Sequence, residues 1–185
     1  MIFRHLIACF FLCLISLGMS YGQNVIYDEE AGLLQPSDLL QQEIEEQGNQ
    51  AYIQQVGNGN HLTVEQHLSE EQASNLIKVL QEGNRHHAYI YQEGVENQLA
   101  LIQSGHENHY CLINQGEENL IVVIQDGSDN LVVQELINTR GVNVELIQEG
   151  NGNEIIQILE GVEARDYKVY QRGDNLRVII RQSAY

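Results

Sequence analysis

The chain has 185 residues, a formal net charge of −17, one proline and no tryptophan. This length suits a single domain. A composition poor in aromatic residues and rich in Gly, Asn and Gln argues against a conventional globular core, and the negative charge argues against nucleic-acid binding.

Residues 1–22 have the features of a secretory signal peptide. Arg4 and His5 precede an apolar run at residues 6–17, and the small residues Ser20 and Gly22 precede a cleavage site before Gln23. The apolar run is too short to span a membrane as a helix once its flanks are considered. We therefore expect a secreted protein.

Residues 23–48 form an acidic leader or linker that lacks any repeat. Seven acidic residues surround Pro36 in this stretch. Such a sequence favours an extended or weakly helical segment over a packed element.

From residue 49 onwards the chain is repetitive. Asparagine recurs every eleven residues at Asn97, Asn108, Asn119 and Asn130, in a unit written Asn-x5-Gln-x-Gly-x-x-Asn. The run between Asn and Gln is rich in β-branched residues and too short for a helix and its connection. Each unit is therefore predicted to be a strand followed by a turn.

Alternation along one such strand predicts its interior face. Leu99, Leu101 and Gln103 share one face, and the residues between them share the other. Two units make a coil of 22 residues, and stacking coils at about 4.8 Å pairs each strand with those above and below it. The predicted fold is all-β, a two-sided β-solenoid of about six coils over residues 49–185.

Amide side chains at the strand ends are predicted to form ladders along the stack, as they do between stacked in-register strands. The predicted ladder positions are Asn49, Gln55, Asn60, Gln66, Asn75, Gln81, Gln92, Asn97, Gln103, Asn108, Asn119, Gln125, Asn130, Gln148, Asn153, Gln171 and Gln182. The predicted turn glycines are Gly57, Gly83, Gly94, Gly105, Gly116, Gly127, Gly150, Gly161 and Gly173.

The repeat is imperfect at several ladder positions. Asn114, Leu136 and Leu159 stand where Gln is expected, and His86 stands where Asn is expected. The spacing also lengthens by four residues between Gln66 and Gln81, and by one residue near 138–143 and near 162–165. Turns between strands can absorb such insertions.

This pattern resembles the curlin repeat of curli, the bacterial functional amyloids. The resemblance implies a structural subunit of extracellular fibres in a biofilm matrix, with other curlin subunits as partners. In curlins the segment after the signal peptide is read by the outer-membrane secretion apparatus, which implies the same role for residues 23–48. A solvated linker is the alternative for that segment.

Charge is distributed unevenly along the repeats. Residues 23–164 contain 24 acidic residues and three basic ones, whereas residues 165–185 contain two acidic residues and a basic end coil. The basic end coil comprises Arg165, Lys168, Arg172, Arg177 and Arg181. These cations either protect an open sheet edge or contact an anionic cell surface or an acidic partner.

A basic, divergent last repeat resembles the minor, nucleating subunit of curli. The major, fibre-forming subunit is the alternative within the family. A soluble β-solenoid that binds a surface or a glycan is the alternative from another class.

No catalytic, metal or cofactor site is expected. His87 and His109 are predicted to face outward, and His86 and His106 occupy repeat positions that any polar residue could fill. The turns lack the nonapeptide of calcium-binding β-rolls. The acidic residues are scattered over short turns, so the chain is not expected to be an enzyme.

Overall fold

The computed structural model describes residues 24–25, 48–70 and 73–184. The predicted signal peptide and most of the predicted leader lie outside these residues. The strands are β1 (Asn24–Val25), β2 (Gly48–Asn58), β3 (His61–Leu68), β4 (Ser74–Asn84), β5 (His87–Val95), β6 (Gln98–His106), β7 (His109–Glu117), β8 (Leu120–Ser128), β9 (Leu131–Asn151), β10 (Glu154–Glu160), β11 (Glu163–Arg172) and β12 (Arg177–Ser183). Within the described part of the chain, no helix is long and apolar enough to cross a membrane.

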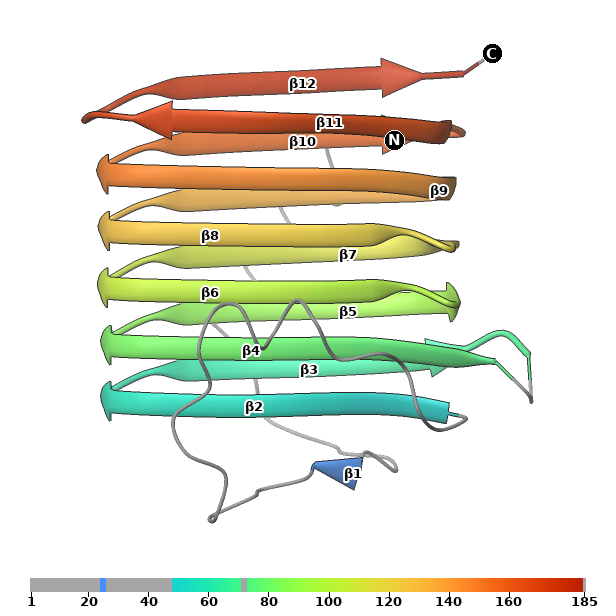
Figure 1. Ribbon diagram of the computed structural model, residues 1–185, viewed down its shortest axis with the longest axis horizontal. Coiled ribbons are helices and arrows are strands. Elements are labelled where there is room, and N and C mark those ends of the chain that lie inside the picture. Colours follow the sequence, from blue (N-terminus) through green and yellow to red (C-terminus); the bar gives the residue numbers. More distant parts are fainter. Residues whose placement is uncertain (1–23, 26–47, 71–72, 185) are drawn as a thin grey trace.

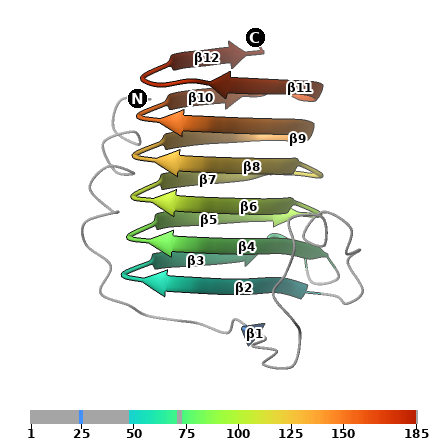
Figure 2. The same cartoon turned by 60° about the vertical axis from the view of Figure 1, so that its left-hand side comes forward.

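The strands stack into two parallel sheets that face each other (Figures 1 and 2). The first sheet contains β2, β4, β6, β8, the second part of β9 and β11, with β1 beside β2. The second sheet contains β3, β5, β7, the first part of β9, β10 and β12. Strand β9 bends around a corner and so belongs to both sheets.

One strand of each sheet makes one coil, and the coils are numbered here from the N-terminal end. Coils 1, 2 and 3 are the pairs β2–β3, β4–β5 and β6–β7. Coil 4 is β8 with residues 131–137, coil 5 is residues 142–151 with β10, and coil 6 is β11 with β12. The structure thus confirms the predicted two-sided β-solenoid of six coils.

The register explains where the chain absorbs its insertions. Ile77, Leu99 and Ile121 lie opposite one another at intervals of 22 residues. Opposite Gln115 and Gly116 stand Ile137 and Thr139, so that Asn138 is left over as a bulge with a φ of 53°. Coils 5 and 6 keep this extra residue, which sets their spacing at 23 residues.

The interior between the sheets is apolar at its centre. Leu99, Leu101, Tyr110 and Leu112 are all at most 2% exposed and belong to one cluster that runs through the stack. Burying each such side chain contributes about 1.5–3 kcal/mol. The predicted alternation is confirmed, because the ladder residue Gln103 shares this face.

Rows of apolar side chains also form on the outward faces. Leu80 packs against Ile102 on the first sheet, and Tyr89, Cys111 and Val133 form a row on the second. These contacts follow from in-register stacking, which places like positions of neighbouring coils about 4.8 Å apart.

Candidate functional site: amide ladders and coil edges

A continuous ladder of six glutamines runs along the interior of the first sheet. The members lie in register on six successive coils and are Gln55, Gln81, Gln103, Gln125, Gln148 and Gln171. Each Nε2 donates to the Oε1 of the next glutamine towards coil 6, with distances of 2.7, 2.8, 3.0 and 2.9 Å for the four bonds that begin at Gln81. Gln55 donates in the same way to Gln81.

The second N–H of these amides ties the two sheets together. Gln103 Nε2 donates to the carbonyl of Asn108 at 3.1 Å, Gln125 to that of His109 at 3.0 Å, and Gln148 to that of Leu131 at 3.2 Å. The carbonyls lie at the start of second-sheet strands, at the corner of the same coil for Gln103 and on the preceding coil for Gln125 and Gln148. The buried amides therefore use both N–H groups, as buried polar groups must.

The equivalent row of the second sheet is broken. It runs Gln66, Gln92, Asn114, Leu136, Leu159 and Gln182. Gln66 Nε2, Gln92 Oε1 and Asn114 Nδ2 are buried and find no hydrogen-bond partner among the described residues. Sequence reasoning placed these residues in one row, and the structure keeps them in register without joining them.

A different polar chain crosses the interior of the second sheet two residues away. Tyr110 donates its hydroxyl proton to Gln134 Oε1 at 2.7 Å, and Gln134 Nε2 donates to Gln157 Oε1. Burial raises the pKa of the Tyr110 hydroxyl far above its ordinary value, so Tyr110 stays protonated and acts as a donor. Sequence reasoning missed that Tyr110 begins a chain of buried hydrogen bonds.

Asparagines at the strand starts join neighbouring coils at the corners. In the second sheet, Asn108 Oδ1 accepts the backbone N–H of Asn130 at 3.1 Å, and Asn130 Oδ1 accepts that of Asn153 at 3.0 Å. The amide nitrogen donates to a glycine carbonyl, as in Asn130 Nδ2 to Gly150 at 2.8 Å. Each corner asparagine thus satisfies one backbone donor and one backbone acceptor of the next coil.

His86 occupies the same corner position in coil 2 with an imidazole ring, and it satisfies one backbone donor of the next coil and faces one carbonyl of its own coil. Its Nδ1 accepts the backbone N–H of Asn108 at 3.3 Å, and its Nε2 lies 3.1 Å from the carbonyl of Glu82. This pattern requires a neutral ring with the proton on Nε2. Burial lowers the pKa of His86, which is the direction that keeps the ring neutral.

Corner asparagines of the first sheet stop before the end of the stack. Asn97 N–H donates to Asn75 Oδ1 at 3.0 Å, and Asn119 N–H donates to Asn97 Oδ1 at 3.2 Å. The next positions are Val142 and Arg165, which lie in register. In the second sheet the last position is Leu176, whose N–H donates to Asn153 Oδ1 at 3.0 Å.

The turn glycines allow the coils to approach closely. Gly105 has a φ of 104°, and a Cβ there would lie 2.2 Å from the carbonyl oxygen of Gly127. Seven of the predicted turn glycines share this crowding against the backbone of the next coil. They are Gly57, Gly83, Gly94, Gly105, Gly116, Gly127 and Gly150. Gly173 lies in register on coil 6, the last coil, and Gly161 instead takes the place of the bulge residue Asn138, where a Cβ would meet nothing closer than 3.5 Å.

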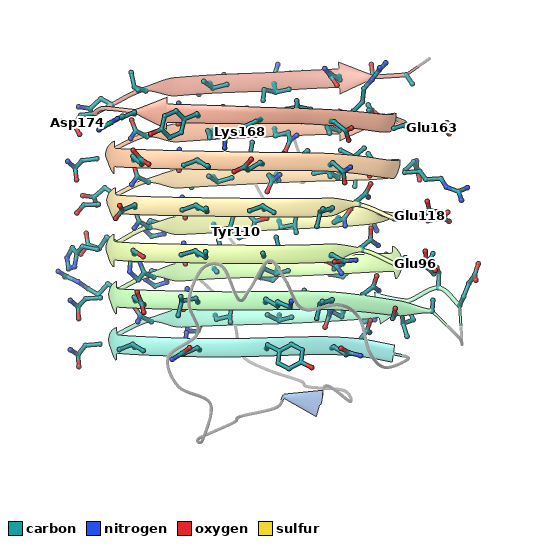
Figure 3. All side chains as sticks on the ribbon, viewed as in Figure 1. Glu96, Tyr110, Glu118, Glu163, Lys168 and Asp174 are labelled. Carbon is teal, nitrogen blue, oxygen red and sulfur yellow. The ribbon has the colours of Figure 1, made fainter. Side chains whose placement is uncertain are left out.

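Acidic side chains project from the corners (Figure 3). Glu96, Glu118 and Glu163 lie above one another at one corner, and Asp174 lies at the opposite one. Arg140 lies between Glu118 and Glu163 in the stack and donates to Glu118 at 2.6 Å, which raises the pKa of Arg140. Arg140 therefore separates the carboxylates of Glu118 and Glu163 in this column.

The basic end coil is paired with the acidic coil beneath it. Lys168 lies 2.8 Å from Glu145, and Arg177 Nε lies 2.9 Å from Glu154. Arg172 similarly lies 3.7 Å from Glu149. Sequence reasoning missed these pairs, although each acid precedes its cation by the 23-residue period of these coils.

Outward histidines form a short row on the second sheet. The rings of His87 and His109 are stacked with centroids 5.1 Å apart, and the ring of His61 lies 6.0 Å from that of His87. Burial lowers the pKa of both His87 and His109. Over the described ranges, no group of three His, Cys, Asp or Glu residues is arranged to hold a metal ion.

These features define a class of protein: a structural β-solenoid whose coils are held by in-register amide ladders and end in two strand edges. Comparison with protein families then gives one match. Residues 73–106, which span β4, β5 and β6, match the curlin associated repeat. No curated protein and no solved structure matches the chain.

Proposed function

We propose that this chain is a secreted structural subunit of extracellular curli-type amyloid fibres. The observation that carries the proposal is the glutamine ladder, which is continuous through all six coils and reaches the open edge at each end of the stack. A further coil can extend such a ladder without changing its geometry. The match of residues 73–106 to the curlin associated repeat supports the same function.

Within the fibre we assign the chain the role of the minor, nucleating subunit at the cell surface. An exposed coil edge templates the next chain, because its backbone N–H and C=O groups accept a parallel strand. The broken row of the second sheet supports this role over that of the major subunit, which must repeat its own contacts indefinitely. The major subunit remains the alternative.

Coil 6 is the part of the chain that we assign to the cell surface. Arg165 and Arg181 are exposed and make no ion pair with another described residue, whereas Lys168, Arg172 and Arg177 already face carboxylates. Two close cations attract an anionic surface within about 8 Å at physiological salt. A purely protective role of these cations at the sheet edge is the competing explanation.

We assign residues 23–48 to recognition by the outer-membrane secretion apparatus. Deleting residues 26–47 should then remove the protein from the cell surface and leave assembly of the purified protein intact. Loss of assembly in the purified, truncated protein would show instead that the segment is part of the fold.

The function is tested by locating the protein on the surface of the cells that produce it. Antibodies raised against the solenoid should label extracellular fibres in electron micrographs, and deletion of the gene should remove or detach those fibres. A protein recovered only as a stable monomer from the medium, with the fibres unchanged, would contradict the proposal and favour a soluble surface- or glycan-binding solenoid.

A further inference from the structure

The two edges of the stack are chemically different. The strands β2 and β3 of coil 1 form one edge, and the strands β11 and β12 of coil 6 form the other. We propose that assembly through this chain runs in one direction. Coil 1 binds the last coil of a different curlin-type chain, whereas coil 6 does not bind a second copy of this chain. This inference rests on the proposed function and adds which edge the partner meets and what that partner must carry.

Hydrogen bonds of the ladder all point the same way. Each glutamine donates towards coil 6 and accepts from the side of coil 1. Gln55 is the first rung; it donates to Gln81, and its Oε1 faces the coil 1 edge with no donor among the described residues. The coil 1 edge therefore offers an acceptor for the amide of an incoming glutamine.

The corner groups of coil 1 extend this pattern. In inner coils, the corner backbone N–H donates to the asparagine of the preceding coil, and a glycine carbonyl accepts from that same asparagine. The equivalent groups of coil 1 at the second-sheet corner are the N–H of Asn60 and the carbonyl of Gly57. An incoming coil satisfies both groups if it carries an asparagine at its own corner.

Coil 6 cannot supply these asparagines. Its two corner positions are Arg165 and Leu176, and Leu176 is 39% exposed. Val142 in coil 5 and His86 in coil 2 show that one corner can depart from asparagine within the stack. Coil 6 is the one coil of the described solenoid that lacks asparagine or histidine at both corners. A second copy seated on it would leave its own corner groups without partners.

The two edges also differ in charge, and this difference favours strand addition at coil 1. Residues 48–68 of coil 1 contain a single charged residue, Glu65, if histidine is counted as neutral. Coil 6 presents the basic end coil, five cations against Glu163, Asp166 and Asp174. Cationic side chains on an edge strand oppose the addition of another strand. The uncharged edge is therefore the one suited to strand addition.

Strand β1 shows that the coil 1 edge accepts a parallel strand. Asn24 lies opposite Gln50 and Val25 opposite Ala51, in the same parallel orientation as every other pair of the solenoid. These contacts involve only the start of β2, which continues to Asn58. A partner strand would take the place of β1 and extend along the rest of β2.

The partner is therefore specified by its last coil. It needs asparagine at both corners, glutamine at the strand end and few cations. A second copy of this chain fails the first and third requirements, so the partner is a different chain with the same repeat.

The first test restores the missing corner residues. The double variant Arg165→Asn/Leu176→Asn should polymerise head to tail, because each restored corner makes new hydrogen bonds, whereas the wild type should give no thioflavin signal over about tenfold the lag of the variant. The matched control is Arg172→Asn/Leu120→Asn, which removes the same charge and an equally exposed leucine (41%) without touching a corner. Equal lag times for the two double variants would overturn the inference.

The second test distinguishes the edges. Gln55→Leu and Gln171→Leu each remove one terminal rung and one ladder bond, but only Gln55 faces the coil 1 edge. With the Arg165→Asn/Leu176→Asn chain as the growing fibre, unmodified protein added at a small molar fraction should bind the coil 6 ends of the fibres through its coil 1, present its own coil 6 and so slow elongation severalfold. Gln171→Leu should act like the unmodified protein, and Gln55→Leu should lose most of the effect. The reverse order, or equal activity of the two variants, would overturn the inference.

Failure of the two proposals can be told apart. If the chain is found in surface fibres but the edge variants behave alike, the direction of assembly is wrong and the fibre function stands. If the chain is absent from fibres and the unmodified protein has no effect on elongation, both are overturned.

Discussion

The two sheets of the solenoid share parallel in-register stacking and apolar alternation, but they differ in their amide rows. The first sheet holds an unbroken glutamine ladder, whereas the second places Leu136 and Leu159 in the equivalent row and leaves amide atoms of Gln66 and Gln92 without partners among the described residues. Both sheets nevertheless form six strands of the same stack. Alternation and turns are thus sufficient to align strands of the second sheet, and the glutamine ladder is an addition in the first.

The second sheet replaces part of the lost ladder elsewhere. Leu136 and Leu159 are fully buried, so the row becomes apolar where the amides end. The chain from Tyr110 through Gln134 to Gln157 supplies buried hydrogen bonds two residues away. Because Gln157 Nε2 has no partner among the described residues, this second chain ends within the stack. The first sheet is therefore the one built for continuation into another coil.

The largest effect is expected at the close approach of the coils. Gly105→Ala should lower the free energy of unfolding by more than about 4 kcal/mol, because the new Cβ meets a neighbouring carbonyl oxygen at a positive φ. Gly161→Ala, at the bulge corner of the second sheet, meets no atom closer than 3.5 Å and should cost only about 1 kcal/mol for its left-handed φ. Urea unfolding followed by circular dichroism measures both. Similar costs at the two sites would contradict the close approach.

The next effect tests the ladder directly. Gln103→Leu leaves Gln81 Nε2 and Gln125 Oε1 buried without partners, which should cost about 2–4 kcal/mol. Gln92→Leu on the second sheet removes an Oε1 that is already unsatisfied and one bond to the carbonyl of Asn97, so it should cost less than about 1 kcal/mol.

Comparing the urea midpoints of the two leucine variants decides whether the ladder matters. Both replacements have the same size and polarity, and both positions are fully buried. If Gln92→Leu proved as costly as Gln103→Leu, the two rows would be energetically alike, and the contrast between the sheets would be wrong.

Much of this arrangement follows from the sequence, because a strict period fixes register. The Asn97 to Asn130 unit gives strands, turns and the facing of Leu99 and Leu101, and the extra residue near Asn138 shows where the spacing changes. Amide orientation does not follow from the sequence. Gln92 and Gln103 occupy like places in the repeat, yet only the packing of neighbouring coils shows that Gln103 bonds on both sides.

Other features could not be predicted from the sequence because the repeat alone does not encode them. Gly161 carries the glycine of the pattern but takes the place of the bulge residue, since the insertion shifts the corner by one position. The ion pairs of the basic end coil connect sites 23 residues apart, so they become visible only once the period of coils 5 and 6 is known. Pairing of β1 with β2 has no signal in the repeat.

A smaller, pH-dependent effect is expected at His86 of the second sheet. Its Nδ1 accepts the N–H of Asn108, so protonation would place two donors against each other. The pKa of His86 is lowered in the folded protein by burial. The unfolded chain therefore binds the proton more readily than the folded protein. The contribution of His86 to the free energy of unfolding should be fully present above a pH of about 6.5, and it should decrease as the pH falls towards the lower pKa of the folded state.

The variant His86→Asn sharpens this test, since asparagine restores the corner residue of the other coils. It should unfold with a smaller change of thermal midpoint between pH 7.5 and 5.5 than the wild type. His87→Asn is measured beside it, because His87 faces outward and burial lowers its pKa as well. A pH dependence reduced only by His87→Asn would assign the effect to the outward row.

The smallest effect should be equal on the two sheets, because outward ion pairs do not involve the ladders. Lys168 on the first sheet and Arg177 on the second lie 2.8 and 2.9 Å from their carboxylates, with cation side chains 52% and 60% exposed. Exposed pairs of this kind contribute about 0–1 kcal/mol. Lys168→Gln and Arg177→Gln should therefore each lower the thermal midpoint slightly and by similar amounts.

Because salt screens exposed charges, the difference from the wild type should vanish at about 1 M salt, where the Debye length is about 3 Å. A loss confined to one sheet, or one that persists at high salt, would show that the cation supports that sheet by packing as well as by charge.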